Sequence, residues 1–135
     1  MPSNDTHGQF DDILALAKPE LRPVCETLRC LIASLHSGFI EVVWPRQKIA
    51  SFGVGPKKMT QHYAYIAVQE SYINLGFYYG ALLPDSSGLL EGAGKILRHV
   101  KLRDVAAARN AAVTALLRQA IADRKRTLAV AHSLG

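Results

Sequence analysis

Cysteine is scarce in this chain, and its two copies do not form a recognisable motif. Cys25 and Cys30 lie five residues apart within one helical pattern and on different faces of it, so they cannot easily form a disulfide. Their spacing is neither a CxxC redox motif nor a zinc-binding pattern. We therefore expect two buried free thiols, as is typical of proteins in a reducing cytoplasm.

Long apolar runs are missing as well. No run approaches the ~20 residues that a membrane-spanning helix needs. The start of the sequence, MPSNDTHGQFDD, is polar and acidic, which does not fit a signal peptide. A cytoplasmic protein without a membrane partner is the expectation.

The common catalytic and metal-binding motifs are also absent. The glycine and lysine loops do not fit the P-loop pattern GxxxxGK[ST], and no serine lies in a GxSxG context. The residues that could bind a metal lack ligand spacing along a helix, such as HExxH; they are His62, Glu70, Asp85, Glu91 and His99. We expect no catalytic residues, no metal site and no cofactor, and an enzyme is the least supported class.

The composition is typical of one soluble globular domain over residues 1–135. A chain of 135 residues can bury a core without disulfides or metals, and its hydrophobic fraction of 49% is ordinary. The net charge of +5 is uneven, because nine lysines and arginines against two aspartates give residues 94–135 a charge of +7. This excess indicates an anionic partner. Alternatively, Arg124, Lys125 and Arg126 only complement the dipole at the end of a helix.

Helical patterns occupy both ends of the chain. Phe10–Ala17 predicts a short amphipathic helix, which Lys18–Pro19 interrupts. A second helix is predicted from Pro19 or Pro23 to Ser37, since its leucines recur at spacings of three and four. The last helix is predicted to begin at Asp104 and to end at Arg126 or a little beyond, with residues 129–135 frayed.

The middle of the chain predicts β-strands, because β-branched and aromatic residues alternate with period two. Five strands are expected, at Phe39–Trp44, Gln47–Val54, Tyr63–Gln69, Tyr72–Tyr79 and Gly94–Leu102. The order of helices, strands and a helix indicates an α+β fold with a small antiparallel sheet and the N- and C-terminal helices packed on one face. Four leucines should be buried under that face: Leu28, Leu31, Leu116 and Leu117. The other face is left to solvent, a ligand or a partner chain.

Strand alternation divides the hairpin of the third and fourth strands into two faces. One face is apolar and suits the core. The other takes Tyr63, Tyr65, Gln69, Tyr72, Asn74, Gly76 and Tyr78. Four of the five tyrosines are therefore expected on the face without helices, where they could stack on a ligand or form hydrogen bonds with it. The alternative is that cross-strand aromatic pairs only stabilise the sheet, and that a ring covers the bare backbone of Gly76.

Two loops rich in glycine and lysine flank this hairpin, FGVGPKKM at 52–59 and LLEGAGKILRH at 89–99. Glycine lets a backbone approach an anion, and lysine neutralises it, although Gly-Pro turns are also common in ordinary loops. The candidate ligand-binding residues are Lys57, Lys58, His62, Tyr63, Tyr65, Asn74, Tyr78, Lys95, Arg98 and His99.

The order of several short motifs resembles a known family. They are Trp44, GPKKM at 55–59 with His62, NLGFYYGA at 74–81, LLEG at 89–92, and Gly94-Lys95 with RHVK at 98–101. This succession resembles the YdhG-like family of uncharacterised bacterial domains (domain of unknown function 1801), over about three quarters of the chain. The resemblance implies a frataxin-like fold, a small sheet with helices packed on one face.

Likeness to frataxins has prompted an iron-chaperone suggestion for some relatives. Frataxin-type iron binding relies on an acidic ridge along the first helix and the adjoining strand edge, and iron prefers clustered carboxylates. In this chain the acids of that region are interleaved with Lys18, Arg22 and Arg29; they are Asp11, Asp12, Glu20, Glu26 and Glu41. The match to an iron chaperone is therefore poor.

The sequence favours a small cytoplasmic module that holds an anionic or aromatic ligand on its tyrosine-rich sheet face. The alternative is a homodimer or partner-protein interface on the same face, because tyrosine is enriched at interfaces. Nucleic acid ranks below both, since the chain lacks the aromatic pattern of sheet-based RNA binders and a continuous basic stripe.

Overall fold

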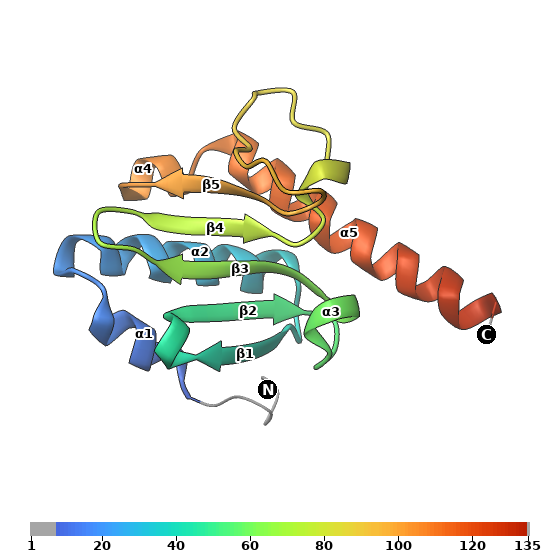
Figure 1. Cartoon of the computed structure of the whole chain (residues 1–135), viewed down its shortest axis with the longest axis horizontal. Helices are drawn as coiled ribbons and strands as arrows, with labels where there is room; N and C mark the ends of the chain where they lie inside the picture. Colours follow the sequence, from blue (N-terminus) through green and yellow to red (C-terminus); the bar gives the residue numbers. More distant parts are fainter. Residues whose placement is uncertain (1–7, 135) are drawn as a thin grey trace.

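A computed structural model describes the backbone of residues 8–134 and the side chains of residues 8–129. Five strands form one antiparallel sheet in which the spatial order follows the chain order. They are β1 (Ile40–Trp44), β2 (Ile49–Gly53), β3 (His62–Val68), β4 (Ile73–Phe77) and β5 (Arg98–Leu102). Helices α2 (Arg22–Leu35) and α5 (Ala111–Leu134) lie on one face, behind the sheet in Figure 1. The α+β fold with terminal helices on one face is confirmed.

The first short helix and its break follow the prediction. Helix α1 (Phe10–Leu16) ends before Lys18, and a single 3-10 turn (Pro19–Leu21) leads into α2. Strands β3 and β4 form the predicted hairpin, closed by a hydrogen bond from the Gln69 N–H to the Tyr72 carbonyl.

Two short helices were not predicted. Helix α3 (Lys58–Gln61) follows β2, and helix α4 (Val105–Ala108) precedes a break at Arg109–Asn110. Asp104 caps α4, since its carboxylate accepts a hydrogen bond from the Ala107 N–H at 2.7 Å. The last long helix therefore begins at Ala111 instead of Asp104.

Helix α5 also ends later than predicted. It continues to Leu134, so the fraying expected from residue 129 is not seen up to that point, and Gly135 lies outside the described residues. Arg124, Lys125 and Arg126 consequently lie about two turns before the end of the helix. The dipole at the helix end acts within the last turn and does not explain this basic cluster.

The core lies between the sheet and the helices, and we call this side of the sheet the covered face. Its strand residues are buried: Val43, Ala50, Phe52, Ala64, Ile66, Val68, Ile73, Leu75, Phe77, Val100 and Leu102. Leu28, Leu116 and Leu117 pack against them as predicted, but Leu31 is only half-buried and lines a surface groove.

The two thiols differ in exposure. Cys25 is buried in the core and Cys30 is exposed, so the expectation of two buried thiols is wrong for Cys30. Five residues correspond to about 140° around a helix, which places the second thiol on the solvent side.

Candidate functional site

The open face of the sheet carries the strand side chains that point away from α2 and α5. Tyr65 and Tyr78 lie there with ring centroids 5.2 Å apart. A Cβ added at Gly76 would collide with the Tyr65 ring. The ring therefore covers the bare backbone of this glycine, and the two tyrosines form an aromatic surface in the middle of the face.

Tyr63 does not belong to this face, so its predicted placement on the open side is wrong. Its side chain is only 2% exposed, and its hydroxyl lies 2.7 Å from Nδ1 of His36, at the end of α2. The cause is an irregularity in the pairing of β2 with β3. Phe52 pairs with Ala64 and Gly53 pairs with His62, so Tyr63 is the extra residue of a β-bulge and alternation fails there.

His62 is instead part of a buried hydrogen-bonded chain under Tyr78. Its Nδ1 lies 2.5 Å from the Ser51 hydroxyl, and that hydroxyl lies 2.8 Å from the hydroxyl of Tyr78. Ser51 and His62 are fully buried, while Tyr78 is half-buried. Ser51 has no motif around it, so sequence reasoning did not select it; the β2–β3 pairing places it beside His62.

Burial determines the protonation states of the His62, Tyr78 and Tyr65 side chains. Loss of solvent lowers the pKa of His62 to about 4; the Gly55 backbone opposes this change and Lys58 adds to it. Burial likewise raises the pKa of Tyr78 to about 12 and raises the pKa of Tyr65. At neutral pH the imidazole is uncharged and both phenols are protonated.

Cations lie against aromatic rings at both ends of the open face. The Lys58 ammonium is 5.2 Å from the centre of the Trp44 ring. At the other end, the Lys101 ammonium and the Arg103 guanidinium are 5.3 Å and 5.4 Å from the centre of the Tyr72 ring. The sequence pointed to Lys58 as a ligand-binding residue and placed Tyr72 on this face, but it did not select Lys101 or Arg103. The signal for Lys101 is the cross-strand register, which aligns Trp44, Ile49, Ala67, Asn74 and Lys101 in one row.

The first glycine-lysine loop does not present a free anion cradle. The Lys57 N–H donates to Oε1 of Gln61 at 2.8 Å. The Gln61 side chain also fills the space beside Gly55, where an added Cβ would collide with it. Lys57 itself is exposed and lies just before α3.

The second loop brings its predicted residues to different places. Arg98 donates from Nη1 to the carbonyl of Leu97 at 2.7 Å and to that of Gly94, so it holds the loop together. Lys95 is exposed in the loop. His99 is half-buried and pairs with Gly76 across β4 and β5, which puts it on the open face.

Asn74 lies on the open face as predicted, between Ala67 and Lys101 in the sheet register. Its Oδ1 is shielded from solvent and makes no hydrogen bond within the described residues. A buried acceptor without a partner costs about 1–3 kcal/mol of stability.

Helix α3, which carries Lys58, is held from the helix side of the sheet. The Tyr79 hydroxyl donates to the Met59 carbonyl at 2.8 Å, and the Arg124 guanidinium donates to the Thr60 carbonyl at 2.9 Å. Arg124 also lies 3.8 Å from the centre of the Tyr79 ring. Through these contacts, α5 fixes the position of one cation of the open face.

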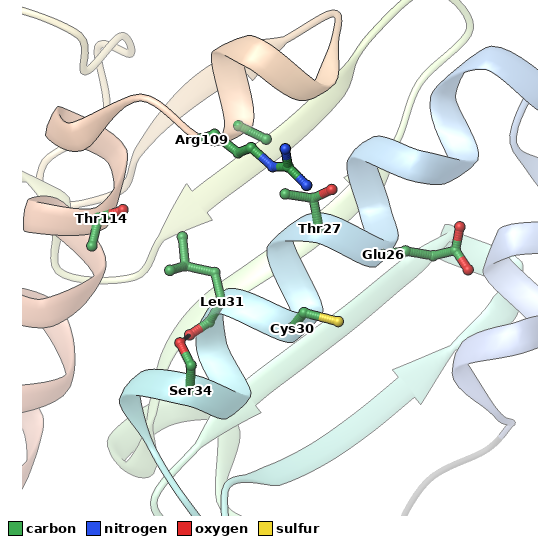
Figure 2. Close-up of a pocket in the computed structure, with 8 residues that line it drawn as sticks. Glu26, Thr27, Cys30, Leu31, Ser34, Arg109 and Thr114 are labelled. Atoms are coloured by element: carbon green, nitrogen blue, oxygen red, sulfur yellow. Dashed lines mark hydrogen bonds between the residues drawn. The ribbon is translucent and has the colours of Figure 1, made fainter.

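A groove of about 460 Å³ lies on the opposite side of the molecule, between α2 and the start of α5. Figure 2 shows the Arg109 side chain beside Thr27, with Cys30 and Leu31 further along α2. Its lining is Glu26, Thr27, Cys30, Leu31, Ser34, Ala108, Arg109 and Thr114. The groove contains none of the candidate ligand-binding residues.

The acids considered for iron do not converge on a metal site. Over the part of the chain that the structure describes, no three histidine, cysteine, aspartate or glutamate side chains are grouped closely enough to hold a metal ion. Glu41 is buried in an ion pair with Arg29, with Oε2 2.6 Å from Nε. The Asp12 carboxylate accepts a hydrogen bond from the Gln9 N–H at 2.6 Å.

Among the described helices, none is both long enough and apolar enough to cross a membrane. Comparisons of this chain with protein-family models, with curated proteins and with solved structures find no match.

Proposed function

We propose that this protein is a cytoplasmic binding module whose open face holds a small anionic ligand with a flat ring. The observation that carries the proposal is the placement of cations against aromatic rings at both ends of this face, Lys58 on Trp44 and Lys101 on Tyr72. Rings offer stacking surfaces, and cations beside them attract an anionic group.

The charge balance of the face supports an anion over a cation. Three cations, Lys58, Lys101 and Arg103, lie against aromatic rings of the face. One acid lies beside them, since Oε1 of Glu91 is 3.9 Å from the Lys101 ammonium. The cations therefore exceed the acids beside them. Both partners of the Glu91 pair are partly exposed, so the pair contributes little to stability and an incoming anion can replace it.

The chain contains one tryptophan, and its position makes it a reporter of this face. Trp44 is half-buried under the Lys58 ammonium, so a ligand that stacks on the face should change its fluorescence. Titration with naphthalene-1-sulfonate tests the proposal, and the neutral naphthalene-1-sulfonamide provides the same rings without the charge. We expect saturable quenching by the sulfonate and weaker binding of the sulfonamide, and added salt should reduce the difference.

Two double variants test whether sulfonate binding depends on the cations of the open face or only on the net charge of the protein. Lys101→Ala with Arg103→Ala should weaken sulfonate binding about tenfold, since each exposed cation contributes roughly 0.5–1 kcal/mol. Arg109→Ala with Arg118→Ala removes the same charge from the helix side, and its affinity should match wild type. Equal losses in both variants would show that only net charge matters and would overturn the site.

We propose a homodimer interface on the same face as the alternative function, because the Tyr65 and Tyr78 rings offer the aromatic surface that interfaces favour. In that case the sulfonate does not bind, and sedimentation shows a dimer that Tyr65→Ala converts to monomer. The lysine and arginine variants should then remain dimers in sedimentation.

A further inference from the structure

The two pairs of a ring and a cation on the open face, Lys58 on Trp44 and Lys101 on Tyr72, lie far apart. Strand pairing aligns a row of residues that begins at Trp44 on β1 and ends at Lys101 on β5, across the whole sheet (Figure 1). Because adjacent strands are about 4.8 Å apart, the four steps of this row separate its ends by roughly 19 Å. A single small ring cannot contact both pairs at once.

Aromatic side chains occupy the middle of the face between these pairs. Tyr65 projects from β3, the central strand, and its ring lies over the backbone of Gly76 on β4. Tyr78 directly follows β4, and its ring centroid is 5.2 Å from that of Tyr65. Both tyrosines are half-buried, so part of each side chain remains accessible. The face therefore presents rings in its middle and a ring with a cation at each end.

This aromatic surface is assembled from separate strands. The sequence lacks the short aromatic motif of sheet-based RNA binders, which argued against nucleic acid. In the folded chain, β1, β3 and the two ends of β4 each contribute one ring, from Trp44, Tyr65, Tyr72 and Tyr78. Sheet-based RNA binders stack about two or three bases on exposed rings of this kind. The missing motif therefore does not exclude this class of partner.

We propose that the open face binds single-stranded nucleic acid, with bases stacked on its rings and backbone phosphates beside the cations at its two ends. This inference rests on the proposed function, because it uses the same face, and it names the class of ligand. A single strand repeats a flat ring and an anionic group along its length, so it can reach both ends of the face. A duplex cannot, because its bases are stacked inside. Stacking on aromatic side chains and contact of cations with phosphates are the interactions that single-strand binders combine.

Unlabelled oligothymidylates of two, four and eight nucleotides test the inference by calorimetric titration. The strand of four should bind about tenfold more tightly than the strand of two, because only the longer strand reaches both ends of the face. Tenfold corresponds to roughly one additional stacked base. The strand of eight should gain less than about threefold more, since the face is already filled.

Two controls distinguish stacking from charge. An abasic chain of eight deoxyribose phosphates keeps the phosphates of the longest strand but has no bases, and it should bind about tenfold more weakly. A hairpin duplex of twelve base pairs has more phosphates but hides its bases, and it should also bind more weakly than the single strand. If either control binds as tightly as the single strand, the net charge of +5 alone explains binding and the inference is overturned.

Variants test whether both ends of the face serve one strand. Lys58→Ala and Lys101→Ala, at opposite ends, should each weaken binding of the eight-nucleotide strand about threefold. Tyr65→Leu removes the central ring and should weaken it about tenfold. Arg118→Ala removes one exposed charge from the helix side, and its affinity should match wild type. An equal loss in all three charge variants would contradict a site on the open face.

The outcomes distinguish the inference from the proposed function. If naphthalene-1-sulfonate binds but the affinity of oligothymidylates does not rise with length, the inference fails and the proposed anion site stands. If neither the sulfonate nor any oligothymidylate binds, both fail. Circular dichroism of each variant checks that a loss of binding does not come from unfolding.

Discussion

The two faces of the sheet each contain a histidine linked to a tyrosine, and the two pairs are built differently. On the covered face, His36 bonds directly to Tyr63, and both side chains are buried. On the open face, His62 reaches Tyr78 only through Ser51, and the tyrosine is half-buried. The first pair closes on itself inside the core, whereas the second ends in a phenol at the surface.

This difference indicates separate roles for similar residues. A closed buried pair satisfies its own polar groups and contributes to folding. The second set of side chains instead ends at Tyr78, whose side chain is only half-buried on the open face. Tyr63 belongs to the hydrophobic core cluster, whereas the rings of Trp44 and Tyr72 on the open face lie beside exposed or partly exposed lysines.

The largest expected effect tests the assignment of the covered face to folding. Leu28→Ala should lower the free energy of unfolding by about 2–5 kcal/mol, because a fully buried side chain leaves a cavity. Leu82→Ala, at a side chain that is 67% exposed, should change it by less than about 0.5 kcal/mol. Urea denaturation measures both, and similar losses would contradict the core described above.

Lowering the pH should weaken the fold through the two histidines. The unfolded chain takes up a proton at His62 near pH 6.5, whereas the folded chain does so only near pH 4. The free energy of unfolding should therefore fall as pH drops from 6.5 to 4, by roughly 2–3 kcal/mol for this residue. Burial also lowers the pKa of His36, which acts in the same direction.

Two variants compare the faces in this pH range. His62→Gln should flatten the dependence of stability on pH more than His36→Gln does, since the pKa of His62 is far below its usual value. Denaturation at a series of pH values provides the measurement. A wild-type stability that stays constant from pH 6.5 to pH 4 would show that neither ring is buried in its neutral form.

The two tyrosines of the pairs can be compared by removing single oxygens. Tyr63→Phe should cost about 1–3 kcal/mol, because it leaves His36 without its partner inside the core. Tyr78→Phe should cost less, about 0.5–1.5 kcal/mol, since its ring is half-buried and other groups can replace the hydroxyl. A larger loss of unfolding free energy for Tyr78→Phe than for Tyr63→Phe would contradict the distinction between the buried His36–Tyr63 pair and the half-buried Tyr78.

The smallest expected effect concerns the cations of the open face. Lys58→Ala should change the free energy of unfolding by about 0.5 kcal/mol or less, because an exposed lysine over a ring contributes little to folding. Its removal should nevertheless alter the emission of Trp44. A large loss of stability would mean that this contact serves the fold instead of a ligand.

Much of the fold could be predicted from the sequence. Apolar residues recur with a regular period along the helices and strands, and residues such as Pro19 and Gly38 mark where helices begin or end. The hairpin faces of Ile66, Leu75 and Tyr65 follow directly from alternation. Tyr63 does not, because a bulge shifts the period by one residue. Gly53 was a sequence signal for this bulge, because a glycine within a strand often marks a bulge or a close approach of two backbones. A Cβ added at Gly53 would collide with His62 and with the Gln61 carbonyl.

The site was only partly predictable for a different reason. Lys58, Tyr65, Asn74 and Tyr78 were found because composition and alternation mark them. Ser51, Lys101 and Arg103 join them through contacts across strands, which a single sequence does not display. Arg124 likewise acts through tertiary contacts, because its guanidinium lies against Tyr79 and donates a hydrogen bond to α3.

The sequential strand order has a consequence for synthesis on the ribosome. Each strand pairs with the one made just before it, so the sheet can assemble step by step as the chain emerges. Only α1 and α2 are available to cover its apolar face during that time, because α5 follows all five strands. Nascent chains should therefore expose the part of the core that contacts Leu116 and Leu117 until residues beyond Ala111 emerge, and this is the stage at which a chaperone that binds apolar surface would act.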